Sequence, residues 1–333
     1  MYVDRSKLFK ELETSRDSKV IVYVTGDRPG LETQIHPEIL NFFVDHLDNI
    51  GTVPKISLFL YTRGGQTLAA WSIANLIRQY CDKFEVVIPS KAHSAGTLIS
   101  LCANTIVMTK QATLGPIDPS VNTPLNPPVP GAPPTARVPV SVEAINGFIE
   151  LAKEMGVSES TDLSSVLSIL TSHVHPLVLG EVYRTRTQIR MLGSRMLLKH
   201  MDDNEKIEKI LSFLCSESGS HDYTIYRQEA RDDLGLNVES PTDELYKIIK
   251  KIYDDISEEL KLTEPYNPEV LLGGQNSVDY DLKRALIEST EGGSHKYTSE
   301  GQLVRQQIAG PNGILQIAIQ DNRRFEGWKY ESL

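Results

Sequence analysis

The sequence places one serine and one pair of glycines where nucleophilic catalysis could occur. Ser94 opens a predicted helix over Ser94–Ala103, and Gly64 and Gly65 form the turn before an earlier helix. At a helix start the serine hydroxyl can be exposed, while the amide of Ala95 points along the helix axis at its positive end. The Gly65 amide, which no side chain obstructs, could converge on the same point. Two such amides would form an oxyanion hole for an acyl intermediate.

Ser94 also has a purely structural interpretation. A serine at this position commonly caps its helix, and such a cap stabilises by about 1 kcal/mol. Three further features favour the catalytic interpretation: the glycine pair one predicted strand earlier, the nearly all-apolar helix SAGTLISLCA, and the Leu114–Pro116 turn after a following strand. A helix without a polar face must be central, so its first residue would be held rigidly by packing.

Two successive strand–turn–helix units position these residues. Short apolar, β-branched runs predict strands at Lys19–Gly26, Lys55–Tyr61, Phe84–Ile88, Thr105–Met108 and Ala112–Leu114. Such runs are typical of strands buried on both faces, as in a parallel α/β sheet. Both candidate turns therefore lie at the carboxyl ends of parallel strands, where α/β proteins place their active sites.

The composition changes abruptly at Gly115. Half of the 18 prolines lie between Pro116 and Pro139, so this stretch can be neither helix nor central strand. It is an excursion that could serve as a mobile lid, a partner-docking strap or a tolerated insertion.

Helical patterns dominate the rest of the chain. Helices are predicted at Ser141–Met155, Thr161–Leu170, Pro176–His200, Glu205–Glu217, Tyr226–Leu234 and Thr242–Leu260, and a strand is predicted in GILQIAIQ near the end. We therefore expect a catalytic domain over residues 1–200 and a mainly helical region over 201–333. The last three helices could form a winged-helix-like module, although generic helical packing explains the same spacing.

The motifs YTRGG, HSAGTLISLCANTIVM and ATLGPIDP resemble the Clp-fold serine peptidases, most closely the serine dehydrogenase proteinase (SDH) family, which is related to signal peptide peptidase A. HPLVLGEVYRTRTQIRML and SHDYTIYRQEA extend the resemblance over about residues 20–262. It implies an α/β fold of stacked ββα units, as in Clp and crotonase proteins. It also implies a nucleophile at Ser94, an oxyanion hole from the Gly65 and Ala95 amides, and a homo-oligomeric assembly.

The general base departs from the Clp pattern. In Clp peptidases a histidine follows soon after the strand that here ends at Gly115–Asp118, where this chain has none. Relatives of signal peptide peptidase A use a lysine, in some of them just before a long helix. The corresponding stretch holds His173 and His175, just before the helix predicted from Pro176. We favour His175 as the base, with His173 and Lys153 as alternatives.

Other side chains have weaker claims to a chemical role. His93 adjoins Ser94, but neighbouring side chains at a helix start diverge, which makes it a poor base. Asp118 could orient the base or bind backbone amides in its proline-bounded turn. His173 and His175 could ligate a metal, although no cysteine or carboxylate stands at a companion spacing.

Composition bounds the remaining function classes. The net charge of −10 disfavours sequence-independent binding of nucleic acid. Three cysteines without CxxC spacing, Cys81, Cys102 and Cys215, suit reduced thiols, and no stretch resembles a signal peptide or membrane span. We therefore expect a cytoplasmic, cofactor-independent serine endopeptidase acting on peptides or unfolded protein segments, without a membrane or nucleic-acid partner. A catalytically silent scaffold or regulated interaction protein, a crotonase-type thioester enzyme, and an activating or regulatory protein partner stay open.

Overall fold

The computed structural model describes residues 2–117, 120–157, 160–217, 220, 222–309 and 315–331. The chain forms two compact units. The first comprises residues 1–114, 226–232 and 236–333, and the second comprises residues 115–225 and 233–235. The boundary expected at residue 200 falls inside the second unit, because α7 (Pro176–Leu197) and α8 (Asn204–Ser212) pack against each other across it.

The first unit is built on an eight-stranded sheet, in the order β10-β5-β3-β2-β1-β11-β12-β13. Its strands are β1 (Lys19–Thr25), β2 (Val53–Tyr61), β3 (Cys81–Ile88), β5 (Thr105–Met108), β10 (Val238–Glu239), β11 (Ser277–Ser289), β12 (Gly293–Ala309) and β13 (Leu315–Glu331). The strands from β10 to β1 are parallel, and β11, β12 and β13 continue the sheet antiparallel. The α/β fold class predicted from the sequence is confirmed.

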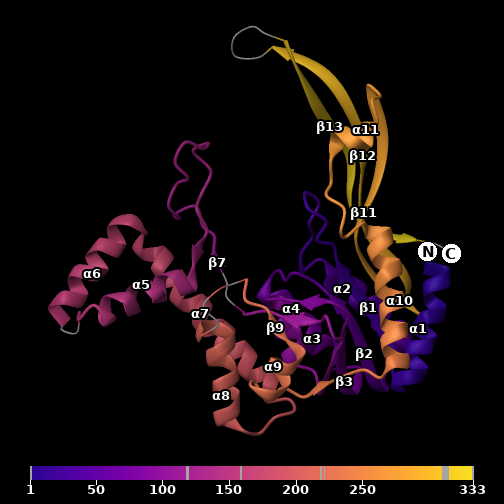
Figure 1. Ribbon diagram of the computed structural model, residues 1–333, viewed down its shortest axis with the longest axis horizontal. Coiled ribbons are helices and arrows are strands. Elements are labelled where there is room, and N and C mark those ends of the chain that lie inside the picture. The colour runs from indigo at the N-terminus through magenta and orange to yellow at the C-terminus, as the bar shows by residue number, and fades with distance from the viewer. Residues whose placement is uncertain are drawn as a thin grey trace. The chain divides into compact units, whose positions relative to one another are not determined.

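Helices cover both faces of the parallel strands. On one face α1 (Tyr2–Arg16) and α10 (Asp243–Leu260) lie side by side (Figure 1), and Phe9 packs in one buried cluster with Val22 of β1. Successive strand residues point to opposite faces. Tyr23 accordingly points away from that cluster and makes an edge contact of 5.4 Å with the ring of Phe43 in α2 (Ile39–Ile50). The apolar run of β1 is therefore buried on both faces, as predicted.

Short elements at the carboxyl ends of the strands carry the candidate site. β4 (Lys91–Ala92) pairs with β6 (Thr113–Leu114), and two helices, α3 (Thr67–Ile77) and α4 (Ala95–Leu101), follow the two candidate turns. All seven residues of α4 are buried, and the helix packs against α3. The sequence prediction of an apolar, central helix is confirmed.

The second unit is mainly helical. It contains β7 (Ser120–Val121), β8 (Val140–Ser141), α5 (Val142–Glu154), α6 (Ser160–His173), α7, α8 and the π-helix η1 (Phe213–Glu217), and β9 (Ile225–Tyr226) stands where the chain passes between the units. A small apolar cluster joins β7, β8 and α7 through Val121, Val140 and Val178. The helices predicted between residues 141 and 200 are thus present.

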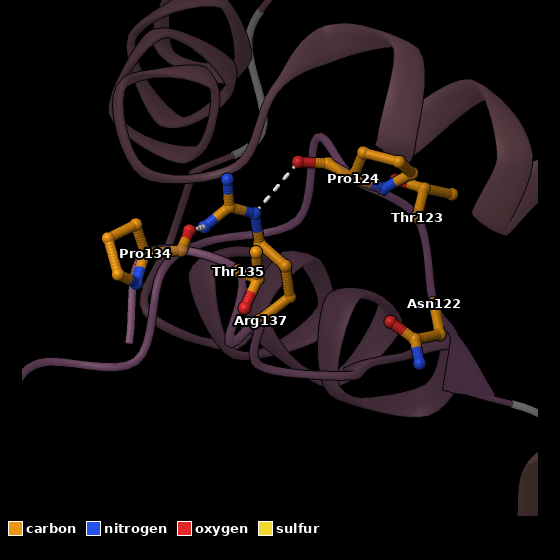
Figure 2. A pocket seen from close by; sticks show the side chains of 6 residues that line it. All are labelled: Asn122, Thr123, Pro124, Pro134, Thr135 and Arg137. Atoms are coloured by element: carbon orange, nitrogen blue, oxygen red, sulfur yellow. Dashed lines mark hydrogen bonds between the residues drawn. The ribbon is translucent and has the colours of Figure 1, made fainter. Parts of the chain in front are cut away.

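The proline-rich excursion is an internally bonded loop. β7 and β8 pair antiparallel at its base, and the buried amide of Asn126 donates hydrogen bonds to the carbonyls of Val121 (2.7 Å) and Val138 (2.9 Å). Arg137 donates to the carbonyls of Pro124 (2.8 Å) and Pro134 (3.0 Å), as Figure 2 shows. Side-chain donors thus satisfy carbonyls that proline-rich backbone cannot pair in a sheet ladder.

The region after residue 200 is more varied than expected. The helices proposed for a winged-helix-like module do not form one, because α8 lies in the second unit whereas α9 (Arg227–Asp232) and α10 lie in the first. Helices continue to α11 (Pro268–Leu272), and three long antiparallel strands follow (Figure 1). Only the last of these, β13, overlaps the predicted GILQIAIQ strand.

Cys81, Cys102 and Cys215 are buried and are not joined in a disulfide. Throughout the described ranges, no helix combines the length and apolarity needed to cross a bilayer.

Candidate active site

The two candidate turns lie side by side in the first unit. The Thr62 amide donates a hydrogen bond to the Lys91 carbonyl, and the His93 amide donates to the Thr62 carbonyl, both at 3.1 Å. Thr62 and Ala92 accordingly form a parallel β-bridge. This pairing places the glycine turn after β2 against the residues that lead into Ser94.

Gly64 and Gly65 are both required by space and by conformation. Their φ angles are 120° and 148°, values that residues with side chains rarely adopt. A Cβ on Gly64 would lie 2.9 Å from the Cβ of Ser94, and a Cβ on Gly65 would lie 2.4 Å from the backbone of Ile35. The turn is therefore packed against Ser94 on one side and Ile35 on the other.

Ser94 is held in a strained conformation. Its φ of 52° and ψ of −111° lie outside the regions that serine favours, and such strain costs about 1 to 3 kcal/mol. It occupies the amino-terminal cap position of α4, yet its side chain makes no capping hydrogen bond. Ser94 is half-buried. The structure thus does not support the capping interpretation, and it leaves the hydroxyl available at the end of the helix.

The fold, as far as it is described, does not use the backbone N–H groups of Gly65 and Ala95 as hydrogen-bond donors. Gly65 lies in a parallel bridge with Ile35, but the bonds of that bridge join the Ile35 amide to the Gly64 carbonyl (2.9 Å) and the Gln66 amide to the Ile35 carbonyl (2.8 Å). Within the described part of the chain, neither the Gly65 nor the Ala95 amide has a protein acceptor. Both N–H groups are therefore available to donate hydrogen bonds to an oxygen of a bound substrate.

A chain of threonine hydroxyls, which the sequence did not reveal, shapes the glycine turn. Thr25, the last residue of β1, donates to the Thr62 hydroxyl at 2.7 Å. That hydroxyl accepts a hydrogen bond from the Gly64 amide at 3.0 Å. Both threonines are fully buried, so these hydrogen bonds fix the shape of the turn from the protein interior. The one sequence signal is the threonine that stands two residues before the glycine pair.

The sequence also did not reveal a second polar group, centred on Asp27 beside the two turns. The carboxylate of Asp27, just beyond β1, accepts a hydrogen bond from the Tyr61 hydroxyl (2.8 Å) and pairs with the Lys91 ammonium (2.7 Å). Burial and the Asp27 charge raise the pKa of Tyr61, so its hydroxyl stays protonated and donates. The group ties together the ends of β1, β2 and β4, which carry the two turns.

His93 is directed to a structural partner. Its Nε2 lies 2.8 Å from the Thr113 hydroxyl on β6. This contact agrees with the expectation that His93 is a poor base for the neighbouring serine.

The candidate bases all belong to the second unit. His175 caps α7, because its Nδ1 accepts a hydrogen bond from the Leu177 amide at 3.2 Å. Lys153 is half-exposed and pairs with Glu150 at 2.7 Å, the arrangement of an ordinary solvated lysine. His173 ends α6 and is exposed. Asp118 lies outside the described residues.

The cap bond occupies one nitrogen of the His175 ring. While the Leu177 amide donates to Nδ1, the lone pair of this nitrogen is not available to another residue. No three His, Cys, Asp or Glu side chains in the described ranges are grouped to hold a metal ion.

Comparison with known proteins finds relatives that span most of this chain. The chain is 28% identical over 258 residues to the uncharacterized protein MJ0137 of Methanocaldococcus jannaschii, covering 75% of this chain and 78% of that protein. It is 26% identical over 258 residues to the uncharacterized protein MJ1495 of the same organism, covering 75% and 74%.

Two solved protease structures are distantly similar. A mutant of the 1510-N membrane-bound stomatin-specific protease is 17% identical with a TM-score of 0.39, covering 69% of this chain and 85% of that one. A mutant of ClpP1 from Listeria monocytogenes is 15% identical with a TM-score of 0.37, covering 71% and 99%.

The family comparison covers the residues that form both turns. Residues 1–130 include β1 to β6, the glycine turn and Ser94. These residues match the family of ClpP-like SDH-type serine proteinases, which confirms the resemblance predicted from the YTRGG and HSAGTLISL motifs.

Proposed function

We propose that this chain is a cofactor-independent serine peptidase that cleaves peptides or unfolded protein segments through an acyl-enzyme on Ser94. The observation that carries the proposal is the conformation of Ser94. It is a strained serine at a helix start, it makes no capping bond, and Gly64 packs directly against it. Strain of this kind persists where a fold over-determines a functional residue.

The oxyanion would be stabilised by the amides of Gly65 and Ala95. As Ser94 Oγ attacks a substrate carbonyl, the carbonyl π electrons move onto oxygen, and the two uncommitted amides donate to that oxygen. Collapse of the tetrahedral intermediate expels the amine, and water then hydrolyses the ester. The Thr25–Thr62–Gly64 hydrogen bonds support this role, because they fix the turn before substrate arrives.

A base must remove the Ser94 proton and return it to the leaving amine. We propose His175 for this role, with His173 and Lys153 as alternatives. For His175 the cap bond to Leu177 must open to free Nδ1, so the capped state is inactive. For Lys153 the ion pair with Glu150 must break and the ammonium must lose its proton.

The proposal extends to the setting of the enzyme. We place it in the cytoplasm as a homo-oligomer, because its three cysteines form no disulfide and the family that its first 130 residues match is ClpP-like. Its substrates are polypeptides and its net charge of −10 disfavours nucleic acid.

One observation favours a second candidate, a catalytically silent scaffold or regulated interaction protein. Among the described residues of the first unit, none is hydrogen-bonded to the Ser94 side chain, so this unit alone does not pair the nucleophile with a base. The chain would then retain the fold while binding partners through other surfaces. A crotonase-type thioester enzyme would also use paired amides, but it would not need the strained serine.

Labelling with a fluorophosphonate tests the proposal. The wild-type chain should be labelled at Ser94, as assigned by mass spectrometry, and Ser94→Ala should not be labelled. Labelling that persists in Ser94→Ala, or its absence from the wild type, would contradict the peptidase. Tight binding of a coenzyme A thioester would instead favour the crotonase-type alternative.

A further inference from the structure

A pocket of about 280 Å³ opens in the first unit between the segment before α2 and the strands β11, β12 and β13. The lining residues that matter here are Glu32, His36, Glu38, Arg284, Tyr297 and Trp328. The volume approaches the lower end of ligand-binding pockets and is large enough for one long side chain. Neither the fold nor the proposed catalysis uses it.

Among the described residues that line the pocket, the single Lys or Arg side chain is neutralised by the fold. Arg284 donates to the carbonyls of Leu31 (3.0 Å) and Glu32 (2.8 Å), and it pairs with Glu326 at 3.0 Å. Its guanidinium also lies over the Tyr297 ring at 5.6 Å. Arg284 is therefore committed to these contacts and offers no free positive charge.

Two carboxylates on the same wall lack such a partner. In the part of the chain that the structure describes, neither carboxylate pairs with a Lys or Arg side chain: Glu32 accepts a hydrogen bond from the Gly30 amide at 3.1 Å, and Glu38 lies 3.7 Å from the imidazole of His36. Both are exposed. With Arg284 balanced by Glu326, the pocket carries a net charge of about −2, which attracts cations.

Aromatic rings complete the wall. Tyr297 and Trp328 meet edge to face with centroids 5.6 Å apart, and the Trp328 indole donates a long hydrogen bond of 3.4 Å to Glu38. The Phe42 ring packs against Trp328, with ring centroids 5.4 Å apart. Carboxylates beside rigid aromatic rings suit a guanidinium or ammonium on an apolar stem.

The pocket is close to the candidate active site along the backbone. Ile35 bonds to the glycine turn on both sides of Gly65, and its neighbours Gln34 and His36 line the pocket. Gly64 in turn packs against Ser94. Residues 34–36 thus connect the wall of the pocket to the glycine turn beside Ser94. An extended substrate that spans both would place one side chain in the pocket while its scissile bond lies at Ser94.

We propose that this pocket binds an arginine or lysine side chain of the polypeptide substrate, and so makes the enzyme selective for basic segments. This inference rests on the proposed peptidase function for its meaning, but the binding itself does not require catalysis.

The test uses the full-length Ser94→Ala variant and calorimetric titration. The probes are capped alanine hexapeptides with a single arginine at each position in turn, each matched with a citrulline peptide of nearly the same shape without the charge. At the best position the arginine peptide should bind at least about tenfold more tightly. The Glu32→Gln/Glu38→Gln double variant should remove that difference, and Glu11→Gln, an exposed carboxylate on α1, should retain it.

The outcomes separate the two proposals. Equal affinity for arginine and citrulline peptides, no binding of either, or a preference that survives the double variant would overturn the pocket assignment. A wild-type chain that is not labelled by fluorophosphonate, while Ser94→Ala still prefers arginine, would overturn the peptidase and keep the basic-segment site. Labelling at Ser94 with no arginine preference would keep the peptidase and overturn the basic-segment site.

Discussion

Gly64 lies so close to Ser94 that a side chain at position 64 would place its Cβ 2.9 Å from the serine Cβ. The glycine turn and the serine are therefore packed together, and a side chain at position 64 could not be added without moving Ser94. This contact determines what a substitution at either position should do.

Gly64→Ala should reduce fluorophosphonate labelling of Ser94 by more than tenfold. The added methyl group meets Ser94 and also requires an alanine at a φ of 120°. Gly51→Ala is the matched control, because Gly51 has a φ of 72° and nothing within 4 Å of an added Cβ. Both variants should lose stability through backbone strain, whereas only Gly64→Ala should lose labelling. Equal labelling rates would refute the contact's role.

Ser94→Gly should be more stable than Ser94→Ala by about 1 kcal/mol. Glycine adopts a φ of 52° and ψ of −111° without steric cost, whereas alanine keeps the strain of the native serine. Urea unfolding of the two variants measures the difference. Neither variant should be labelled. If Ser94→Gly were the less stable of the two, Ser94 would not be strained in the folded protein.

His175→Asn and His175→Ala separate the two roles proposed for this residue. Asparagine is a good helix cap, so His175→Asn should keep the stability of α7, whereas His175→Ala should lose about 1 kcal/mol. Loss of the general base should lower labelling equally in both. If His175→Asn is labelled like the wild type, His175 acts only as a cap, and Lys153 and His173 become the candidates.

Arg5→Met should destabilise the chain by about 3 to 5 kcal/mol. The Arg5 side chain is fully buried, where it pairs with Glu288 and Glu259, both at 2.8 Å, and with Asp255. Burial raises the pKa of Glu259, but Arg5 and Lys296 more than offset it and hold the pKa at about 2, so removing Arg5 leaves a buried carboxylate without its main partner. Chemical denaturation measures the loss, and Arg231→Met, which removes an exposed pair, should leave stability essentially unchanged.

The stability of the first unit should fall between about pH 6.5 and pH 3 because of His46. Burial, and then the neighbouring His295, lower the pKa of His46 from 6.5 to about 3, and its Nδ1 contacts the buried Ser289 hydroxyl at 2.7 Å. In this range the unfolded chain binds a proton that the folded chain does not, so acid favours unfolding by up to about 1.4 kcal/mol per pH unit.

The matched variants isolate that contribution. His46→Gln should flatten the pH dependence of the unfolding free energy relative to wild type, whereas His36→Gln, at an exposed position, should leave it unchanged. An unchanged slope in His46→Gln would show that other groups titrate in this range.

The parallel half of the fold was predictable because its apolar runs are uninterrupted. α1 escaped prediction because its buried face includes Arg5, a charge where a pattern of apolar residues would be expected. β12 escaped prediction for a similar reason: its Lys296 is buried, but it is neutralised by Glu259 and Glu331. Charges that are paired over long sequence separations cannot be recognised locally.

The site was predictable where it depended on neighbours in sequence. A serine at a helix start and a glycine pair after a strand are visible in the sequence, and the structure places their backbones in contact. The role of Ile35 beside Gly65 could not be predicted from the sequence, because Ile35 acts through a backbone pairing that any apolar residue could make. The side chain that would complete the catalytic pair is still a prediction.

The pairing of β1 with β11 has a consequence for how this protein is made. Tyr23 in β1 is paired with Ile287, far along the chain, so this edge of β1 stays open until β11 has been synthesised. Until then β1 presents unpaired backbone groups, a template for association between nascent chains. A fragment ending at residue 200 would carry this open edge permanently. Expression of residues 1–200 alone should therefore yield aggregates, because the fragment lacks the strand that covers this edge of β1.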